Sequence, residues 1–207
     1  MSEVLRVGGF EPLTTIDYPD HLSCVVFTQG CPWRCGYCHN HELIDAKRPG
    51  AFDWQQIYGF LQSRVGLLDA VVFSGGEPLL QTRLPEAIQQ VKALGYKVGL
   101  HTGGAYVQRF QACLDHVDWV GFDVKHLPEH YLEITQTPGS GNKAWQSLEL
   151  LLDSGVAHQL RLTRHRDLMS DQQLDRLKKI LRHNYASDLL VQKCNTNNCL
   201  DKRLNLS

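Results

Sequence analysis

Short, continuously apolar runs alternate along the chain with longer amphipathic stretches of helical period. Unbroken runs of β-branched and aromatic residues are typical of strands that are covered on both faces, as in a parallel sheet. The sequence predicts six such strands, at residues 23–28, 70–74, 98–101, 119–124, 159–163 and 189–192.

Helices are predicted between these strands, and several have recognisable ends. Asp53 can cap a helix, and Ser170 with Gln173 forms a capping box ahead of an apolar stripe. Gly95 and Gly155 suit the ends of two other helices. The helices are expected directly after residues 53, 82 and 170, and over residues 105–115 and 142–154.

These elements make six βα-like units, if residues 29–69 are a loop and one helix. Right-handed crossovers between parallel strands would curl such a sheet, but a closed eight-stranded barrel usually needs about 250 residues. We therefore predict an α/β fold, a partial (β/α)6 open barrel. The whole of 1–207 is expected to be one domain, with an N-terminal extension (1–21), the partial barrel (22–193) and a polar tail (194–207).

The balance of charge limits the possible partners. Lys and Arg number 21 against 22 Asp and Glu, which gives no electrostatic reason to expect nucleic acid or an anionic membrane as a partner. The first residues lack the apolar core of a secretory signal, and no segment approaches the ~18 consecutive apolar residues of a membrane span. The sequence predicts a cytoplasmic protein.

Cysteines provide the central chemical signal. The chain has seven, and Cys31, Cys35 and Cys38 fall within one short loop after the first predicted strand. In a reducing compartment such clustering favours metal binding over disulfides. Three thiolates can bind three corners of a [4Fe–4S] cluster and leave the fourth iron open, as a catalytic metal requires.

A structural zinc knuckle is the alternative interpretation of this loop, with His39 or His41 as the fourth ligand. Zinc sites usually pair two separated Cys-x2-Cys-like arms, and no second arm matches here. Cys194 and Cys199 lie far away in the sequence with a spacing of five. The cluster is therefore the favoured interpretation.

A second signal, Ser-Gly-Gly-Glu-Pro at residues 74–78, ends the second predicted strand. Gly75 and Gly76 would let the backbone approach a ligand closely, and ligands of α/β sheets bind at the carboxyl ends of strands. By itself this stretch is more typical of a tight strand-to-helix turn than of a ligand site.

The two motifs in this order resemble the radical S-adenosylmethionine (SAM) superfamily. That resemblance implies that Cys31, Cys35 and Cys38 hold a [4Fe–4S] cluster whose open iron chelates the amino and carboxylate groups of SAM. Reductive cleavage then releases a 5′-deoxyadenosyl radical that abstracts hydrogen from a substrate. The resemblance also implies that Gly75, Gly76 and Glu77 contact the methionine part of SAM.

Flanking residues resemble glycyl-radical-enzyme activating proteins, especially the activator of anaerobic ribonucleoside-triphosphate reductase. The similarity includes Thr-Ile-Asp-Tyr-Pro at 15–19 and Tyr-Cys-His-Asn at 37–40, and it is dense over residues 8–125. It implies hydrogen abstraction from a glycine of a partner enzyme, with anaerobic ribonucleotide reductase as the expected partner. Flavodoxin or ferredoxin is the electron donor that the resemblance implies.

The same resemblance extends to individual positions. It implies that Tyr37 and His39 contact the adenine of SAM, and that Asp123 and Lys125 assist at the SAM site, with a monovalent cation beside Asp123. The third strand departs from the pyruvate formate-lyase type, since it ends His-Thr-Gly-Gly (His101 and Thr102) instead of Asp-Thr-Asn-Gly, which puts the cation site in doubt. Arg161 is a further candidate for SAM contact. From the residues alone, Asp123 and Arg161 are equally consistent with structural ion pairs.

The remaining cysteines are expected to play lesser parts. Cys24 and Cys113 are predicted to be buried, inert thiols. Cys194 and Cys199 could bind metal, form a disulfide or touch a partner, and reduced surface thiols are the favoured interpretation. Two rival functions stay open: another small radical SAM enzyme, such as 7-carboxy-7-deazaguanine synthase, and a zinc-stabilised interaction module without catalysis.

Overall fold

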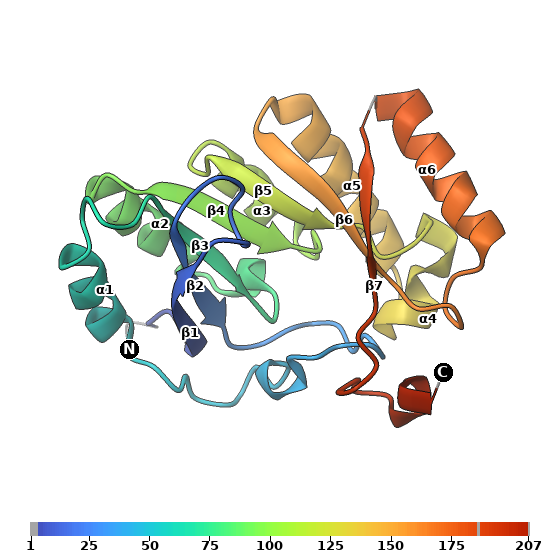
Figure 1. Ribbon diagram of the computed structural model, residues 1–207, viewed down its shortest axis with the longest axis horizontal. Coiled ribbons are helices and arrows are strands. Elements are labelled where there is room, and N and C mark those ends of the chain that lie inside the picture. The colour runs from blue at the N-terminus through green and yellow to red at the C-terminus, as the bar shows by residue number, and fades with distance from the viewer. Residues whose placement is uncertain (1–3, 186, 207) are drawn as a thin grey trace.

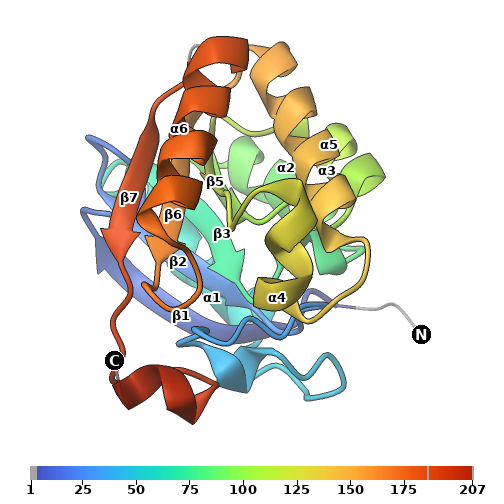
Figure 2. The same cartoon turned by 90° about the vertical axis from the view of Figure 1, so that its right-hand side faces the viewer.

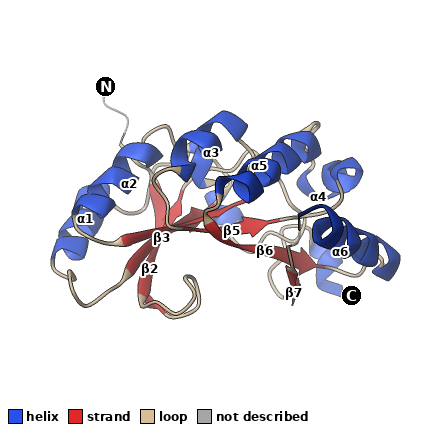
Figure 3. Ribbon diagram, turned by 90° about the horizontal axis from the view of Figure 1, so that it is seen from above, coloured by secondary structure: helices blue, strands red, loops and turns tan. Residues whose placement is uncertain are grey.

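The computed structural model describes residues 4–185 and 187–206, which form a single sheet with helices along one side (Figures 1 and 3). Seven strands follow one another in the sheet in the order of the sequence. The strands are β1 (Val7–Thr14), β2 (Ser23–Thr28), β3 (Ala70–Gly75), β4 (Lys97–Thr102), β5 (Trp119–Asp123), β6 (Ala157–Arg164) and β7 (Leu189–Lys193).

Strands β2 to β7 are parallel and confirm the six predicted strands, whose bounds differ by at most two residues. Both faces of β2 to β5 are buried, which explains their unbroken apolar runs, whereas β6 is half-buried and β7 is partly exposed. On β2, Cys24 and Val26 pack into the large core under the helices. Val25 points to the other face, where it packs with Tyr18 and Trp119. The curved sheet is the predicted partial barrel.

Strand β1 was not predicted. It lies in the segment expected to be an N-terminal extension, and it pairs antiparallel with β2, so that Phe10 faces Val26 in the register. Its sequence, VGGFEPLT, contains two glycines and a proline, which weaken any strand signal.

Within the described residues, six α-helices lie between the strands, and most of them are where the sequence predicts them. The predicted Ser170–Gln173 capping box forms, since the Ser170 backbone N–H donates to Gln173 and the Gln173 backbone N–H donates to the Ser170 hydroxyl. Asp53 caps its helix through the backbone N–H of Gln55. The helices are α1 (Trp54–Gln62), α2 (Leu84–Ala93), α3 (Val107–Leu114), α4 (Tyr131–Thr135), α5 (Ser140–Ser154) and α6 (Asp171–Tyr185).

Several details of the helices differ from the sequence prediction. Helix α3 is shorter than the predicted 105–115, and α5 begins two residues before the predicted 142–154. Helix α2 begins one residue later than expected, after Arg83, which makes no side-chain cap. The short helix α4 was not predicted because it contains only five residues. No helix among residues 4–185 and 187–206 is both long and apolar enough to cross a membrane.

The final segment, after β7, turns back beneath the carboxyl ends of the strands (Figure 2). It ends in a 3-10 helix (Lys202–Leu206). The backbone N–H of Asp201 donates to the carbonyl of Gly36 at 2.8 Å, so this segment lies against the loop that carries the cysteine motif.

Candidate functional site

The loop that follows β2, residues 29–40, is called the cysteine loop here. Its base is fixed by backbone hydrogen bonds, since Gly30 donates to Leu43 at 2.7 Å and Cys31 donates to Ile44 at 3.1 Å. On its far side, the backbone N–H of Arg34 donates to the carbonyl of Thr135 at 2.9 Å. The loop therefore presents its thiols from a braced backbone.

Burial keeps the three thiols of this loop in the neutral form when no metal is bound. It raises the pKa of Cys31 to about 12 and also raises the pKa values of Cys35 and Cys38. The Lys125 ammonium opposes this rise at each of the three. Binding of cationic iron would supply the larger stabilisation that thiolates need.

Two glycines at the end of β3 let the SAM-type motif pack directly on the cysteine loop. Gly75 has a φ of +115°, and a Cβ built on Gly76 would lie 2.3 Å from the carbonyl oxygen of Gly30. The backbone of Gly76 donates to Thr28 at 3.0 Å, and that of Glu77 donates to Gly30 at 2.9 Å. The two motifs, distant in sequence, are thus joined through their backbones.

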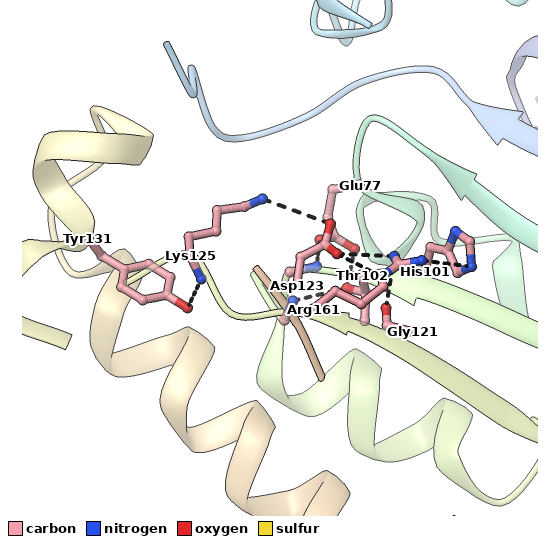
Figure 4. Close-up of polar contacts among 10 residues, drawn as sticks. Glu77, His101, Thr102, Gly121, Asp123, Lys125, Tyr131 and Arg161 are labelled. Carbon is pink, nitrogen blue, oxygen red and sulfur yellow. Dashed lines mark hydrogen bonds and ion pairs between the residues drawn. The ribbon is translucent and has the colours of Figure 1, made fainter. Parts of the chain in front are cut away.

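Glu77 is a buried carboxylate with three protein donors. It is 2% exposed. Its Oε1 accepts from the Thr102 hydroxyl at 2.7 Å and from the Leu79 backbone at 3.1 Å, and its Oε2 accepts from the Gly103 backbone at 3.1 Å (Figure 4). Burial raises the pKa of Glu77 in spite of these hydrogen bonds and of nearby Lys125. The side chain is consequently fixed in one orientation at the ends of β3 and β4.

Asp123, at the end of β5, and Arg161, in the middle of β6, form an ion pair between neighbouring strands. Arg161 Nη2 lies 3.0 Å from Asp123 Oδ1, and the Lys125 ammonium lies 4.0 Å from Oδ2 (Figure 4). Burial opposes ionisation of Asp123, but Arg161 and Lys125 outweigh it and lower the pKa of the carboxyl. Asp123 therefore carries a negative charge with two cations beside it.

His101 stands next to this pair as a neutral ring. Its Nε2 donates to the carbonyl of Asp17 at 2.9 Å and lies 3.3 Å from Arg161 Nη1. Burial, together with the Arg161 charge, lowers its pKa to about 4. An acid at this position would add a second negative charge, which the imidazole does not.

Lys125 projects between aromatic rings toward the cysteine loop. Its ammonium lies 5.7 Å from the ring centre of Trp33 and 5.8 Å from that of Tyr37, while its backbone N–H donates to the Tyr131 hydroxyl at 3.0 Å. Burial alone would lower its pKa, but Tyr37, Cys35 and Asp123 raise it well above its usual value. The side chain is a permanent cation beside the thiols.

A cavity of 430 Å³ opens at the carboxyl ends of the strands, where ligands of α/β sheets bind. The structure brings every residue predicted for the site to its wall. These residues are Cys31, Cys35, Tyr37, Cys38, His39, Gly75, Gly76, Glu77, His101, Thr102, Asp123, Lys125 and Arg161. The contacts assigned to each of them remain predictions.

Several wall residues were not among those predicted from the sequence. They are Trp33, Asn40, Ser74, Gly103, Thr163, Gln192, Lys193 and Asn195. Thr163, Gln192 and Lys193 belong to the ends of the last two strands, so their position after an apolar run could have marked them. Asn195 carries no such signal, because only the return of the final segment brings it to the cavity.

The prediction of surface thiols at Cys194 and Cys199 was wrong. Both side chains are buried, and their sulfurs lie 4.0 Å apart. Burial, together with the neighbouring Cys199 thiol, raises the pKa of Cys194 to about 11. The two thiols face His39, whose Nε2 donates to the carbonyl of Asn195 between them. As predicted, Cys24 and Cys113 are also buried.

The cysteine loop fits a cluster better than a single ion. Among the described residues, the sulfurs of Cys31, Cys35 and Cys38 are not part of any group of three ligand atoms that lie close enough together to bind one metal ion. A cubane cluster binds its three thiolates at separate iron atoms, so it requires the wider spacing. The cavity beside the loop also offers anionic and cationic groups for the charged ends of an amino acid.

Comparisons with known proteins agree with this geometry. The chain is 28% identical over 183 residues to a protein of Methanocaldococcus jannaschii that is provisionally named a glycyl-radical enzyme activating enzyme, and covers 75% of it with 85% of its own length. It is 30% identical over 129 residues to the pyruvate formate-lyase-activating enzyme of Clostridium pasteurianum. That match takes in 60% of this chain but only 54% of the relative.

Solved structures with the same fold bind SAM. Streptococcus suis SuiB bound to S-adenosylmethionine matches 86% of this chain with a TM-score of 0.65 and 14% identity. Native anSMEcpe with bound AdoMet matches 81% with a TM-score of 0.64 and 14% identity. The chain spans 44% and 49% of those two proteins, so the likeness concerns the barrel.

A family profile covers most of the barrel. Residues 25–183, which include both motifs and the carboxyl ends of β2 to β6, match the profile described as Radical SAM superfamily. The cofactors expected from the motifs, a [4Fe–4S] cluster and SAM, are those of this family. The chain therefore belongs to the radical SAM superfamily.

Proposed function

We propose that this chain activates a glycyl radical enzyme, with an anaerobic ribonucleoside-triphosphate reductase as its partner and flavodoxin or ferredoxin as its electron donor. The observation that carries the proposal is the convergence of both motifs and all the predicted cofactor contacts on one cavity. The named relatives support the class of activating enzyme. We place this reaction in the cytoplasm, where the seven cysteines would stay reduced.

The cysteine loop would hold the cluster through Cys31, Cys35 and Cys38. When bound, the cluster and SAM supply a one-electron reduction of the sulfonium and a carbon-centred radical that can take a hydrogen atom. Lys125 favours the thiolate form of the ligands because its charge lowers their pKa values. The protein contributes ligands, charge and position.

Glu77 and the ion pair at Asp123 would orient the two charged groups of SAM's methionine end. Glu77, whose orientation is fixed by its three donors, would accept from the amino group. Arg161 and Lys125 present positive charge to the carboxylate. Trp33 and Tyr37 are buried side chains in the cavity wall, and such apolar surface would limit the access of water to a reactive radical.

The test combines cofactor chemistry with the partner. Anaerobically reconstituted protein, given SAM, a reductant and a purified anaerobic ribonucleotide reductase, should form 5′-deoxyadenosine and a glycyl-radical EPR doublet on the reductase. Cys35→Ala should abolish both, whereas Cys113→Ala, a buried thiol of α3 outside the site, should leave both intact.

The contrary outcomes separate the two levels of the proposal. Undiminished 5′-deoxyadenosine from Cys35→Ala would remove the cluster assignment. SAM cleavage without a radical on the reductase, together with turnover of a tetrahydropterin, would instead identify a small-molecule enzyme such as 7-carboxy-7-deazaguanine synthase.

A further inference from the structure

A second group of potential metal ligands lies beside the cavity, where the final segment meets the cysteine loop. One imidazole nitrogen of His39 and the sulfurs of Cys194 and Cys199 all lie within 4.8 Å of one another. Cys194 is 5% exposed and Cys199 is fully buried. Within residues 4–185 and 187–206, this is the one trio of histidine, cysteine or acidic side chains gathered so closely.

The spacing of these atoms is that of ligands around one tetrahedral ion. Two sulfurs that are each about 2.3 Å from a zinc ion at the tetrahedral angle lie about 3.8 Å apart. The sulfurs of Cys194 and Cys199 lie 4.0 Å apart. Small side-chain rotations would therefore suffice to bring both onto a metal.

The three groups also converge on a single oxygen. The carbonyl of Asn195 lies 3.5 Å from the Cys194 sulfur and 3.6 Å from the Cys199 sulfur, and it accepts from His39 Nε2. In the metal-free protein, this oxygen lies beside all three ligand groups. A cation that displaced the thiol protons would find two thiolates and an imidazole, with an oxygen as a neighbouring fourth donor.

We propose that His39, Cys194 and Cys199 bind a divalent zinc-type ion at a site separate from the cysteine motif. Two thiolates and one imidazole are a donor set that zinc takes readily, whereas magnesium and calcium prefer oxygen ligands. The fourth position belongs to an oxygen, from Asn195 or from water. The site uses none of the three cysteines assigned to the cluster.

Such an ion would fasten the final segment to the cysteine loop. The two are already in contact, because Asp201 donates to the carbonyl of Gly36 at 2.8 Å and Asn198 Nδ2 donates to that of His39 at 3.4 Å. At its other end, the segment is tied to β6, since the Cys194 backbone donates to Arg164 at 2.9 Å. The metal would hold the cavity wall formed by Lys193 and Asn195 in place.

This inference goes beyond the proposed function and gives His39 a ligand role in addition to the adenine contact that the resemblance implies. A full-length variant with Cys31, Cys35 and Cys38 all changed to alanine removes the cluster ligands, so metal bound to it cannot come from the cysteine loop. We expect this variant, purified from zinc-supplemented cells, to retain roughly one zinc per chain by elemental analysis.

Further substitutions in that variant locate the metal. Cys194→Ser and Cys199→Ser should each reduce the zinc content at least fivefold, and Cys113→Ser, which removes a buried thiol elsewhere, should leave it unchanged. Zinc X-ray absorption should show two sulfur and two lighter neighbours. Substitution with cobalt should give a thiolate charge-transfer band that is lost in Cys194→Ser.

Three results would overturn the proposal. They are a variant without zinc, zinc that persists after both Cys194→Ser and Cys199→Ser, and a Cys194–Cys199 disulfide found by mass analysis of anaerobically alkylated protein. Circular dichroism shows whether each variant is folded. Should one fail to fold, titration of the folded triple-alanine variant with zinc and a chromophoric chelator still decides, because binding no tighter than micromolar contradicts a structural site.

Discussion

The guanidinium of Arg161 contacts Oδ1 of Asp123 through both Nε, at 3.1 Å, and Nη2, at 3.0 Å. The pair joins the end of β5 to the middle of β6, where the two residues are register partners. Its geometry places a fixed positive charge at the position where the resemblance implies a monovalent cation. We infer that Arg161 takes over the electrostatic role of that cation.

Replacement of Arg161 by glutamine should therefore create a dependence on monovalent cations. Without the guanidinium, the negative charge of Asp123 would repel the carboxylate of SAM, and we expect SAM affinity to fall about tenfold. Potassium should restore part of this loss. Equilibrium binding of SAM, with potassium exchanged for choline at constant ionic strength, measures both effects. Strong potassium dependence of the unaltered protein would contradict this inference.

The neutral state of His101 predicts a loss of stability in mild acid. Its pKa is lowered from 6.5 to about 4, so between these values the unfolded chain binds a proton that the native chain does not. The free energy of unfolding should then decline as pH falls from 6.5 toward 4, by up to about 3 kcal/mol from this group, with no contribution above pH 6.5.

Urea unfolding followed by circular dichroism at several pH values measures this effect. His101→Gln should flatten the decline, while His116→Gln, at an exposed position, should preserve it. Parallel pH profiles for the unaltered chain and His101→Gln would show that the ring does not resist protonation.

Glu77→Gln should weaken both SAM binding and the fold. A glutamine has an NH2 group in place of one carboxylate oxygen, and that group cannot accept a hydrogen bond. If it replaces Oε2, the Gly103 N–H loses its acceptor; if it replaces Oε1, the Leu79 N–H and the Thr102 hydroxyl lose theirs. We expect a loss of about 1–3 kcal/mol in the free energy of unfolding. Loss of the negative charge should also lower SAM affinity.

The exposed Glu86 offers the control for this substitution. Glu86 pairs with Arg83 on the surface, and Glu86→Gln should change stability by less than about 0.5 kcal/mol. Equal effects at the two positions would mean that the buried network around Glu77 contributes nothing specific.

Gly76→Ala should disturb the cysteine loop from a distance in sequence. The added Cβ would lie 2.3 Å from the Gly30 oxygen, so either β3 or the base of the loop must move. We expect reduced iron content after reconstitution and a lower melting temperature. Gly59→Ala, on α1 with no heavy atom near the new methyl group, should be neutral or stabilising. Normal iron content in Gly76→Ala would argue against this coupling.

Much of the barrel could be predicted because a strand that is buried on both faces has a continuous run of apolar residues in its sequence. In β3, Phe73 packs into the main core and Val72 packs on the opposite face, so apolar residues follow one another without the alternating polar positions of a half-exposed strand. Strand β1 escaped prediction because residues 8–14 of its sequence are half-buried or exposed, and its pairing with β2 is made by the backbone.

The residues of the site could be predicted from the sequence, but the contacts between them could not. Each motif residue follows an apolar run, and parallel strand ends meet at one edge. Nothing local indicates that Arg161 reaches Asp123, since the pairing depends on the register between β5 and β6. The approach of Asn195 to His39 joins positions 156 residues apart, and it depends on the course of the final segment.

The backbone bonds from Gly76 and Glu77 to Thr28 and Gly30 also bear on how the chain could vary in length. They set the spatial separation of the two motifs independently of the polypeptide between them. Gly66 lies between the two motifs, in an exposed turn, and a Cβ built on it would have no other heavy atom within 4 Å. Residues inserted at this turn would lengthen the connection between α1 and β3. They would leave the carboxyl ends of the strands, where the two motifs meet, unchanged, so the fold should tolerate insertions at this turn.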